Sequence, residues 1–200
     1  MEDGIRAVVD GLEAALRDSG LTQAEFATAL GTSASRFSTY RAGKTMPSAA
    51  FYVRALRLAT SLKTARERGW MTPPSAAREI RRALRDGDDL WALKLALQSR
   101  DHLRELLRAD DDAGSAWAAA PRTTGDRKWD ALLAALTERE FDEAGREPPG
   151  WAAARGMRLT ERDEWVLPSL LLTADEVRAA TPHRLAEHGV FAAERDLVTA

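Results

Sequence analysis

The sequence predicts an all-α protein, and three observations support this fold class. Alanine and arginine are abundant whereas β-branched residues are sparse, which favours helix. Apolar side chains recur at helical spacing in several stretches, and glycine or proline stands near the ends of these stretches. We expect an N-terminal domain (1–68), a helical connector (69–110), a linker (111–127) and a small, mostly helical C-terminal domain (128–200).

Composition excludes several classes of protein. The chain has 200 residues, of which 44% are hydrophobic and 30% charged, as in ordinary globular domains. It contains no cysteine, which excludes disulfides and thiolate metal sites. No apolar run approaches the roughly 20 residues that span a bilayer, and the acidic N-terminus lacks a signal-peptide pattern. We therefore expect a cytoplasmic protein that makes no membrane contact.

The N-terminal domain should begin with an amphipathic helix over residues 5–17. Thr22 can cap a second helix, because Glu25 stands three residues later and completes a capping box. Gly31 should end this helix, since glycine permits the left-handed backbone of a tight turn. The expected buried face of the second helix comprises Phe26, Ala27 and Leu30.

A third helix is expected over residues 34–42, with Ser33 as its cap. Phe37 and Tyr40 should turn inward, which leaves short polar side chains and Arg36 outside. Short side chains allow close approach to base edges, and an arginine can donate two hydrogen bonds to a guanine. The pattern therefore favours a helix that enters the major groove of DNA.

A loop and a fourth helix should complete this domain. Gly43 ends the third helix, and Lys44 and Thr45 follow in a loop suited to phosphate. Residues 47–48 should start the fourth helix. The side chains expected to close the core from this helix are Phe51, Val53, Leu56 and Leu58.

Basic charge is concentrated in the same region. Residues 36–68 hold eight basic side chains and one acid, a net charge of +7. Residues 69–200 hold 19 basic and 24 acidic side chains, a net charge of −5. This asymmetry indicates a polyanion site on one domain. A solvated helical face is the alternative, but the coincidence with the two-helix pattern favours DNA.

Residues 21–48, LTQAEFATALGTSASRFSTYRAGKTMPS, resemble the Xre/Cro-type (lambda-repressor-like) helix-turn-helix family. The matching positions are Leu21-Thr22-Gln23, Ala27, Gly31-Thr32-Ser33, Ser38, Gly43 and Pro47. The resemblance covers residues 5–60 and implies a four- to five-helix DNA-binding domain. Two positions depart from the family, which often has Gln at Ala34 and Glu at Arg41.

The resemblance also implies roles for individual residues. A glutamine at the start of the second helix usually meets a phosphate in this family, and residues early in the third helix read bases. The base-contacting residues expected here are Ala34, Ser35, Arg36 and Thr39. The phosphate-contacting residues expected are Thr22, Gln23, Ser38, Arg41, Lys44 and Thr45. We expect a DNA-binding transcriptional regulator, an autorepressor of its own operon; a helix-turn-helix that contacts only proteins is the alternative.

The connector should contain two helices. Ser75 can cap a helix that runs to residue 85, and a longer helix should cover residues 88–108. The longer helix carries a leucine stripe of Leu90, Leu93, Leu97, Leu103, Leu106 and Leu107. This stripe either pairs two copies into a homodimer, which would match symmetric DNA half-sites, or packs inside the chain.

The C-terminal domain should contain a helix over residues 129–143 and a short helix capped by Thr181, with Pro182 first and Gly189 just past its end. All six tryptophans lie outside the helix-turn-helix. One interpretation is that the tryptophans form a second hydrophobic core. The alternative is that the aromatic residues Trp151, Trp165 and Phe191 bind a partner. Residues 181–200 are similar to tails of regulators encoded beside nucleotidyltransferase toxins. An antitoxin that neutralises such a toxin is therefore the alternative function.

We expect neither catalysis nor a cofactor. The sequence holds no glycine-rich phosphate loop and no Gly-x-Ser-x-Gly elbow. The three histidines do not form a metal set: His102 lies among charges and should be exposed, while His183 and His188 should lie on different faces of a helix. No metal site is expected.

Overall fold

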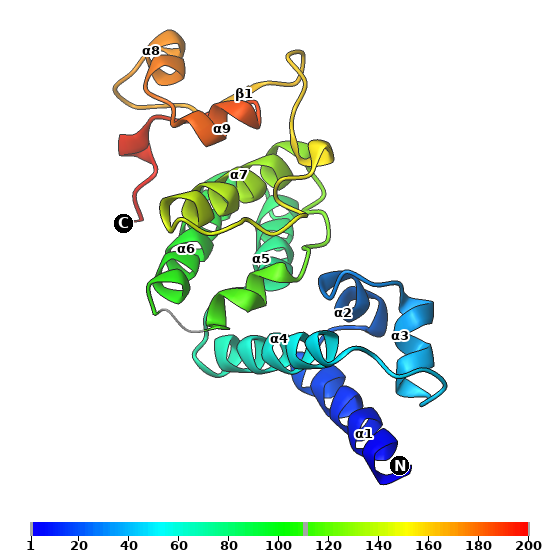
Figure 1. The fold of residues 1–200 in the computed structure, drawn as a ribbon. Coiled ribbons are helices and arrows are strands. Elements are labelled where there is room, and N and C mark those ends of the chain that lie inside the picture. Colours follow the sequence, from blue (N-terminus) through cyan, green and yellow to red (C-terminus); the bar gives the residue numbers. More distant parts are fainter. Residues whose placement is uncertain (1, 110–111, 200) are drawn as a thin grey trace. The chain divides into compact units, whose positions relative to one another are not determined.

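The computed structural model describes residues 2–109 and 112–199, and its secondary structure is mostly helical, as the sequence predicts (Figure 1). A pair of two-residue parallel strands is the one sheet among the described residues. The elements in chain order are α1 (Glu2–Ser19), α2 (Gln23–Ala29), α3 (Ala34–Arg41), α4 (Ala49–Glu67), α5 (Pro73–Arg85), α6 (Asp89–Arg108), the 3-10 helix η1 (Asp112–Ala118), α7 (Arg127–Glu143), η2 (Arg155–Met157), β1 (Trp165–Val166), α8 (Ala174–Ala179), α9 (His183–Glu187), β2 (Val190–Phe191) and η3 (Glu194–Asp196).

The chain forms two compact units whose boundaries differ from the expected ones. The first comprises residues 1–72 with 109–120, and the second comprises 73–108 with 121–200. The expected connector is therefore not a separate region, because α5 and α6 pack with α7 in the second unit. Part of the expected linker forms the helix η1, which packs on α4. The expected boundary between connector and linker, at residues 110 and 111, lies outside the described residues.

Aromatic side chains form the centre of the first unit. Phe37 is fully buried, and its ring centroid lies 5.4 Å from that of Phe26 and 6.5 Å from that of Phe51. The expectation that Val53 and Leu56 close this core is wrong, since they are 43% and 37% exposed. Phe51 and Leu58 are buried as expected. The apolar residues that α4 turns inward are Phe51, Ala55, Leu58, Ala59, Leu62 and Ala65.

One tryptophan fixes the segment that the sequence presents as a linker. Trp117 in η1 is 1% exposed, and its neighbours Ala116 and Ala119 are also buried. Small residues and turn formers surround Trp117 in the sequence, so composition alone indicates a loop. The buried indole and the alanines beside it therefore help to hold this segment against α4.

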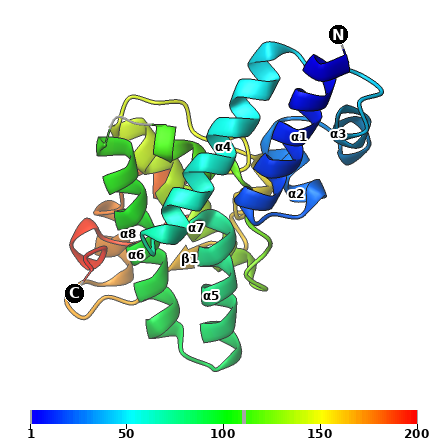
Figure 2. The same ribbon diagram turned by 90° about the horizontal axis from the view of Figure 1, so that it is seen from below.

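Helix α7 is the central helix of the second unit and is buried over most of its length. In Figure 1 it lies between the α5–α6 pair and the C-terminal elements. Figure 2 shows α5 and α6 side by side. Most of the α6 leucine stripe is used in this core: Leu97, Leu103, Leu106 and Leu107 are buried, Leu93 is half-buried and Leu90 is exposed.

Several helix ends differ from the prediction. Helix α5 begins at Pro73 rather than after Ser75, because a proline in the first turn lacks only an N–H that would be unsatisfied anyway. Thr181 does not cap α9, since its hydroxyl donates to the carbonyl of Val177 at 2.7 Å. Gly189 does end α9, with a φ of +71°. Helix α8 is absent from the sequence-based prediction, although Thr173 and Glu176 form a capping box at its start.

We predict that Trp117→Ala lowers the free energy of unfolding of the first unit by about 3–5 kcal/mol, because the change removes a fully buried indole. Hydrogen exchange of the α4 amides in the full chain measures this loss. Trp91→Ala is the control, since Trp91 is half-exposed and belongs to the second unit. Unchanged exchange in α4 after Trp117→Ala would mean that residues 112–118 act only as a linker.

Candidate nucleic-acid interface

The two helices α2 and α3 are joined by a tight turn whose backbone groups are satisfied locally. Thr22 Oγ1 accepts from the Glu25 N–H at 3.3 Å, and the Glu25 carboxylate accepts from the Thr22 N–H at 2.9 Å. Gly31 has a φ of +71°, and the Ser33 hydroxyl accepts from the Arg36 N–H at 3.2 Å. These caps confirm the predicted helix starts and fix the direction in which α3 leaves the turn.

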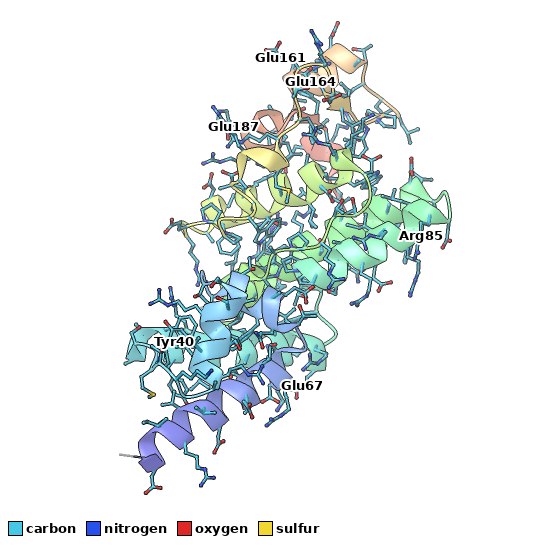
Figure 3. The ribbon with its side chains drawn as sticks, turned by 90° about the vertical axis from the view of Figure 1, so that its right-hand side faces the viewer. Tyr40, Glu67, Arg85, Glu161, Glu164 and Glu187 are labelled. Carbon is cyan, nitrogen blue, oxygen red and sulfur yellow. The ribbon has the colours of Figure 1, made fainter. Side chains whose placement is uncertain are left out.

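Buried rings determine which face of α3 is exposed. Phe37 and Tyr40 point into the first unit, and the Tyr40 ring lies 5.2 Å from that of Phe51 (Tyr40 is labelled in Figure 3). The opposite face is open, and its exposed residues are Ala34, Ser35, Arg36 and Ser38. Thr39 is half-buried, and its hydroxyl donates to the Arg36 carbonyl at 2.7 Å. The exposed face of α3 is therefore small and polar, with one guanidinium.

Tyr40 holds the guanidinium of Arg36 in place. The Arg36 Nε–H donates to the Tyr40 hydroxyl oxygen at 2.7 Å, and the guanidinium carbon lies 5.8 Å from the ring centroid. This bond uses Nε and leaves both terminal nitrogens as donors. This role of Tyr40 is not among the sequence-based predictions, although residues at i and i+4 on a helix are neighbours and the spacing of Arg36 and Tyr40 indicates it.

Gln23 and Arg41 bond to each other and brace three helices. The Gln23 amide donates from Nε2 to the Ala34 carbonyl at 3.1 Å and accepts through Oε1 from Arg41 Nη1 at 2.7 Å. Arg41 Nη2 also pairs with the Glu13 carboxylate in α1 at 3.3 Å. Both side chains are half-buried. Local sequence patterns could not identify Glu13, because it lies 28 residues from Arg41.

The remaining expected phosphate contacts lie near the ends of α2 and α3. Thr22 before α2, and Lys44 and Thr45 after α3, are exposed. Other basic residues of the +7 region serve the fold instead. Arg66 donates to the Asp18 carbonyl at 2.7 Å and so caps α1, and the Arg68 guanidinium stacks 4.8 Å from the centre of the Trp70 ring.

The three aromatic residues expected to bind a partner are half-buried in the second unit. The Trp165 ring packs 5.0 Å from that of Trp129, and Phe191 lies under the Arg178 guanidinium at 4.4 Å. A role for Trp151, Trp165 and Phe191 in partner binding remains a prediction. Leu170 and Leu171 are not among the expected site residues, yet they are 101% and 71% exposed in the loop before α8.

The histidines occupy three different environments. His183 is exposed and His188 is fully buried, so they do lie on different faces. His188 Nδ1 lies 3.0 Å from the Met157 carbonyl and Nε2 lies 2.7 Å from the buried Glu138 carboxylate, which ties α7 to α9. His102 is half-buried rather than exposed, and burial lowers its pKa, partly opposed by the charge of Asp101. No cluster of three potential metal ligands occurs in residues 2–109 and 112–199.

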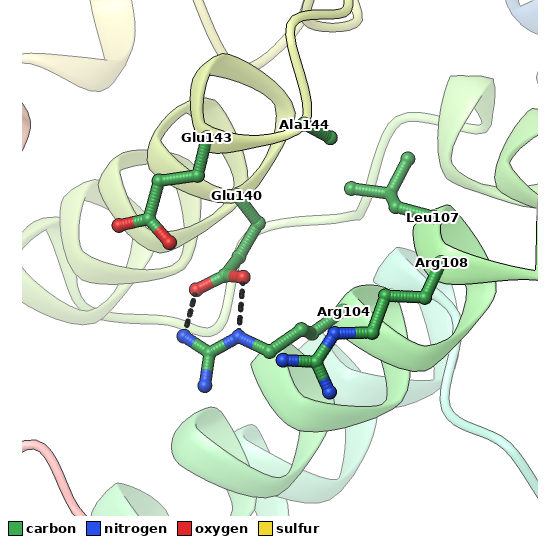
Figure 4. A pocket seen from close by; sticks show the side chains of 6 residues that line it. All are labelled: Arg104, Leu107, Arg108, Glu140, Glu143 and Ala144. Carbon is green, nitrogen blue, oxygen red and sulfur yellow. Dashed lines mark hydrogen bonds and ion pairs between the residues drawn. The ribbon is translucent and has the colours of Figure 1, made fainter.

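A hollow of about 340 Å³ lies between α6 and α7 and contains charges that are already paired (Figure 4). The Arg104 guanidinium donates to both oxygens of the buried Glu140 carboxylate, at 2.8 and 2.6 Å, and this pairing raises the pKa of Arg104. Glu143 accepts from Arg139 at 2.6 Å, and Arg108 pairs with Glu105 at 3.1 Å. The Arg104–Glu140 pair joins α6 to α7, whereas the other two pairs each lie within one helix.

No family model, curated protein or solved structure matches the chain. Among the described residues, none of the helices has the length and apolar character required to cross a membrane. The geometry of α2 and α3 is therefore the main basis for a functional proposal.

We predict that Gln23→Ala lowers the stability of the first unit by about 1–2 kcal/mol, because two hydrogen bonds are lost and the Arg41 Nη1 donor is left unpaired. Hydrogen exchange of the α2 and α3 amides measures the change. Lys44→Ala is the control, since an exposed lysine should change stability by less than about 0.5 kcal/mol. If Gln23→Ala and Lys44→Ala show the same exchange rates, Gln23 does not stabilise the first unit, and contact with a phosphate is the role that is left for it.

Proposed function

We propose that this protein is a sequence-specific DNA-binding transcriptional regulator, an autorepressor of its own operon. Its α2 and α3 act as a helix-turn-helix of the Xre/Cro type, and α3 lies in the major groove. Arg36 and Ser35 read base edges, Ala34 meets a thymine methyl, and Thr39 lies beside them. Two copies bind the two half-sites of a symmetric operator.

The exposed face of α3 carries this proposal. Phe37 and Tyr40 are anchored inside, so Ala34, Ser35 and Ser38 face solvent, while Thr39 is half-buried. A short polar surface lets a helix backbone approach the floor of the groove, and the terminal nitrogens of Arg36 match the two acceptors of a guanine. Tyr40 orients Arg36 before binding, which lowers the entropy lost when the contact forms.

The residues proposed to contact phosphates differ in how many of their polar groups are already bonded within the protein. Lys44 and Thr45 are exposed and can approach a phosphate directly. Gln23 and Arg41 are committed to the brace with Glu13, so they contact a phosphate only through the edges that the brace leaves open. Ser38 adds a hydroxyl donor. The Thr22 hydroxyl donates to the Glu25 carboxylate at 2.7 Å, so Thr22 contacts a phosphate only by giving up that bond.

We predict that Arg36→Ala costs about 1–3 kcal/mol in binding to an operator selected from a random library, and relaxes the preference at one base pair. Lys44→Ala is the matched variant: it should weaken all duplexes alike and reduce the dependence of log K on log salt by about one unit. Titrations of the full chain at two salt concentrations separate these effects.

Two further results test the assignment. Tyr40→Phe keeps the buried ring but removes the bond to Arg36, so it should weaken the same base preference less than Arg36→Ala does. If Arg36→Ala retains the full base preference, α3 is not the reading helix.

An antitoxin is the second candidate function, and the exposed Leu170 and Leu171 favour it. These two leucines form an exposed apolar pair, and contiguous exposed apolar surface often marks a protein-binding site. In this case the second unit binds and neutralises a toxin while the first represses the operon. We predict that the double variant Leu170→Ser/Leu171→Ser loses co-purification with a toxin encoded beside the gene but keeps DNA affinity. Retained co-purification would exclude this loop as the binding surface.

A further inference from the structure

Helix α5 of the second unit presents a stripe of four arginines. Pro73, Ala76, Ala77, Ile80 and Ala83 form its buried face. The other face carries Arg78, Arg81, Arg82 and Arg85, at the i, i+3, i+4 and i+7 spacing that places side chains on one side of a helix. We call these four residues the α5 arginine stripe. Arg78, Arg82 and Arg85 are exposed and Arg81 is half-buried; Figure 3 shows Arg85 near the end of the helix.

The α5 arginine stripe keeps most of its positive charge. Helix α5 contains one acidic residue, Glu79. Its carboxylate pairs with Arg78 and Arg82 at 3.2 Å each, so two guanidiniums share one negative charge. Arg81 and Arg85 have no ion-pair partner among the described residues. The helix therefore has a net charge of +3, within a part of the chain that the sequence presents as acidic.

The chemistry of the stripe fits a phosphate backbone. All four side chains are arginines, whose planar guanidinium donates two parallel hydrogen bonds to a phosphate. The spacing gives a line of such groups along about 10 Å of helix, since each residue rises 1.5 Å. An acidic protein could also be attracted, but a row of bidentate donors without apolar side chains between them favours phosphates.

We propose that the α5 arginine stripe is a second contact surface for the DNA backbone, independent of base sequence. The inference rests on the proposed function of the first unit. Residues 68–72 are the only ones between α4 and α5, so the stripe is tethered to the unit that carries α3 by a short segment. Contacts that are weak alone then add to affinity.

The test compares two double variants of the full chain in DNA titrations over a range of salt concentrations. R81Q/R85Q removes the two unpaired charges of the stripe and leaves the Glu79 pairs intact. R155Q/R162Q is the matched control, because both arginines are exposed, belong to the same unit and have no ion-pair partner among the described residues. Glutamine is a good helix former, and circular dichroism checks that both variants fold.

We expect R81Q/R85Q to reduce the slope of log K against log salt by about two units, equally for operator and random duplexes, since each lost phosphate contact removes about 0.9 units. R155Q/R162Q should change the slope by well under one unit. If the two variants show equal slopes of log K against log salt, the proposal is overturned. The alternative is then that the stripe binds an acidic protein.

The same titrations distinguish this proposal from the proposed function. Arg36→Ala tests base reading by α3, whereas R81Q/R85Q tests a contact made with any duplex. If Arg36→Ala keeps the base preference while R81Q/R85Q reduces the slope, the proposed reading helix fails and the α5 contact stands. If Arg36→Ala relaxes the preference while R81Q/R85Q has no effect, the α5 contact alone fails.

Discussion

The burial of Phe37 is the constraint on which the first unit depends. Its ring packs between Phe26 of α2 and Phe51 of α4, so it holds the two short helices to the long one. An eight-residue helix such as α3 is marginal by itself and takes its stability from packing. Because one face of α3 is fixed inward, its other face has to meet solvent or a partner. The exposed surface is thus a consequence of the core.

Binding and folding compete for the same side chains at the edge of this surface. Gln23 and Arg41 brace α2 and α3 through each other, and Glu13 joins α1 to them. A residue used in this way positions the helices but has fewer free donors for DNA. Arg36 differs, because Tyr40 takes its Nε and leaves the terminal nitrogens outward. The interface therefore divides into residues that hold the helices and residues that remain free to bind.

Local rules predicted the parts of the fold that local chemistry determines. The caps at Thr22 and Ser33 and the left-handed turn at Gly31 follow from side chains within three residues. The errors arise where distant packing decides. Val53 and Leu56 match a helical apolar pattern, yet Phe51 and Ala55 set which face of α4 turns inward. Trp117 orders a segment with the composition of a loop, and Glu13 reaches Arg41 only after folding.

Charge in this protein is organised by helix face rather than by domain. The formal net charge is −2, so the molecule as a whole repels a polyanion, and at distances beyond about 8–10 Å at physiological salt this repulsion is weak because ions screen it. Within that distance the α5 arginine stripe and the loop at Lys44 each present local positive charge. Attraction then depends on which face approaches the duplex. In the proposed regulator, electrostatics orients the duplex against these faces, and discrimination between base sequences falls to the short contacts of α3.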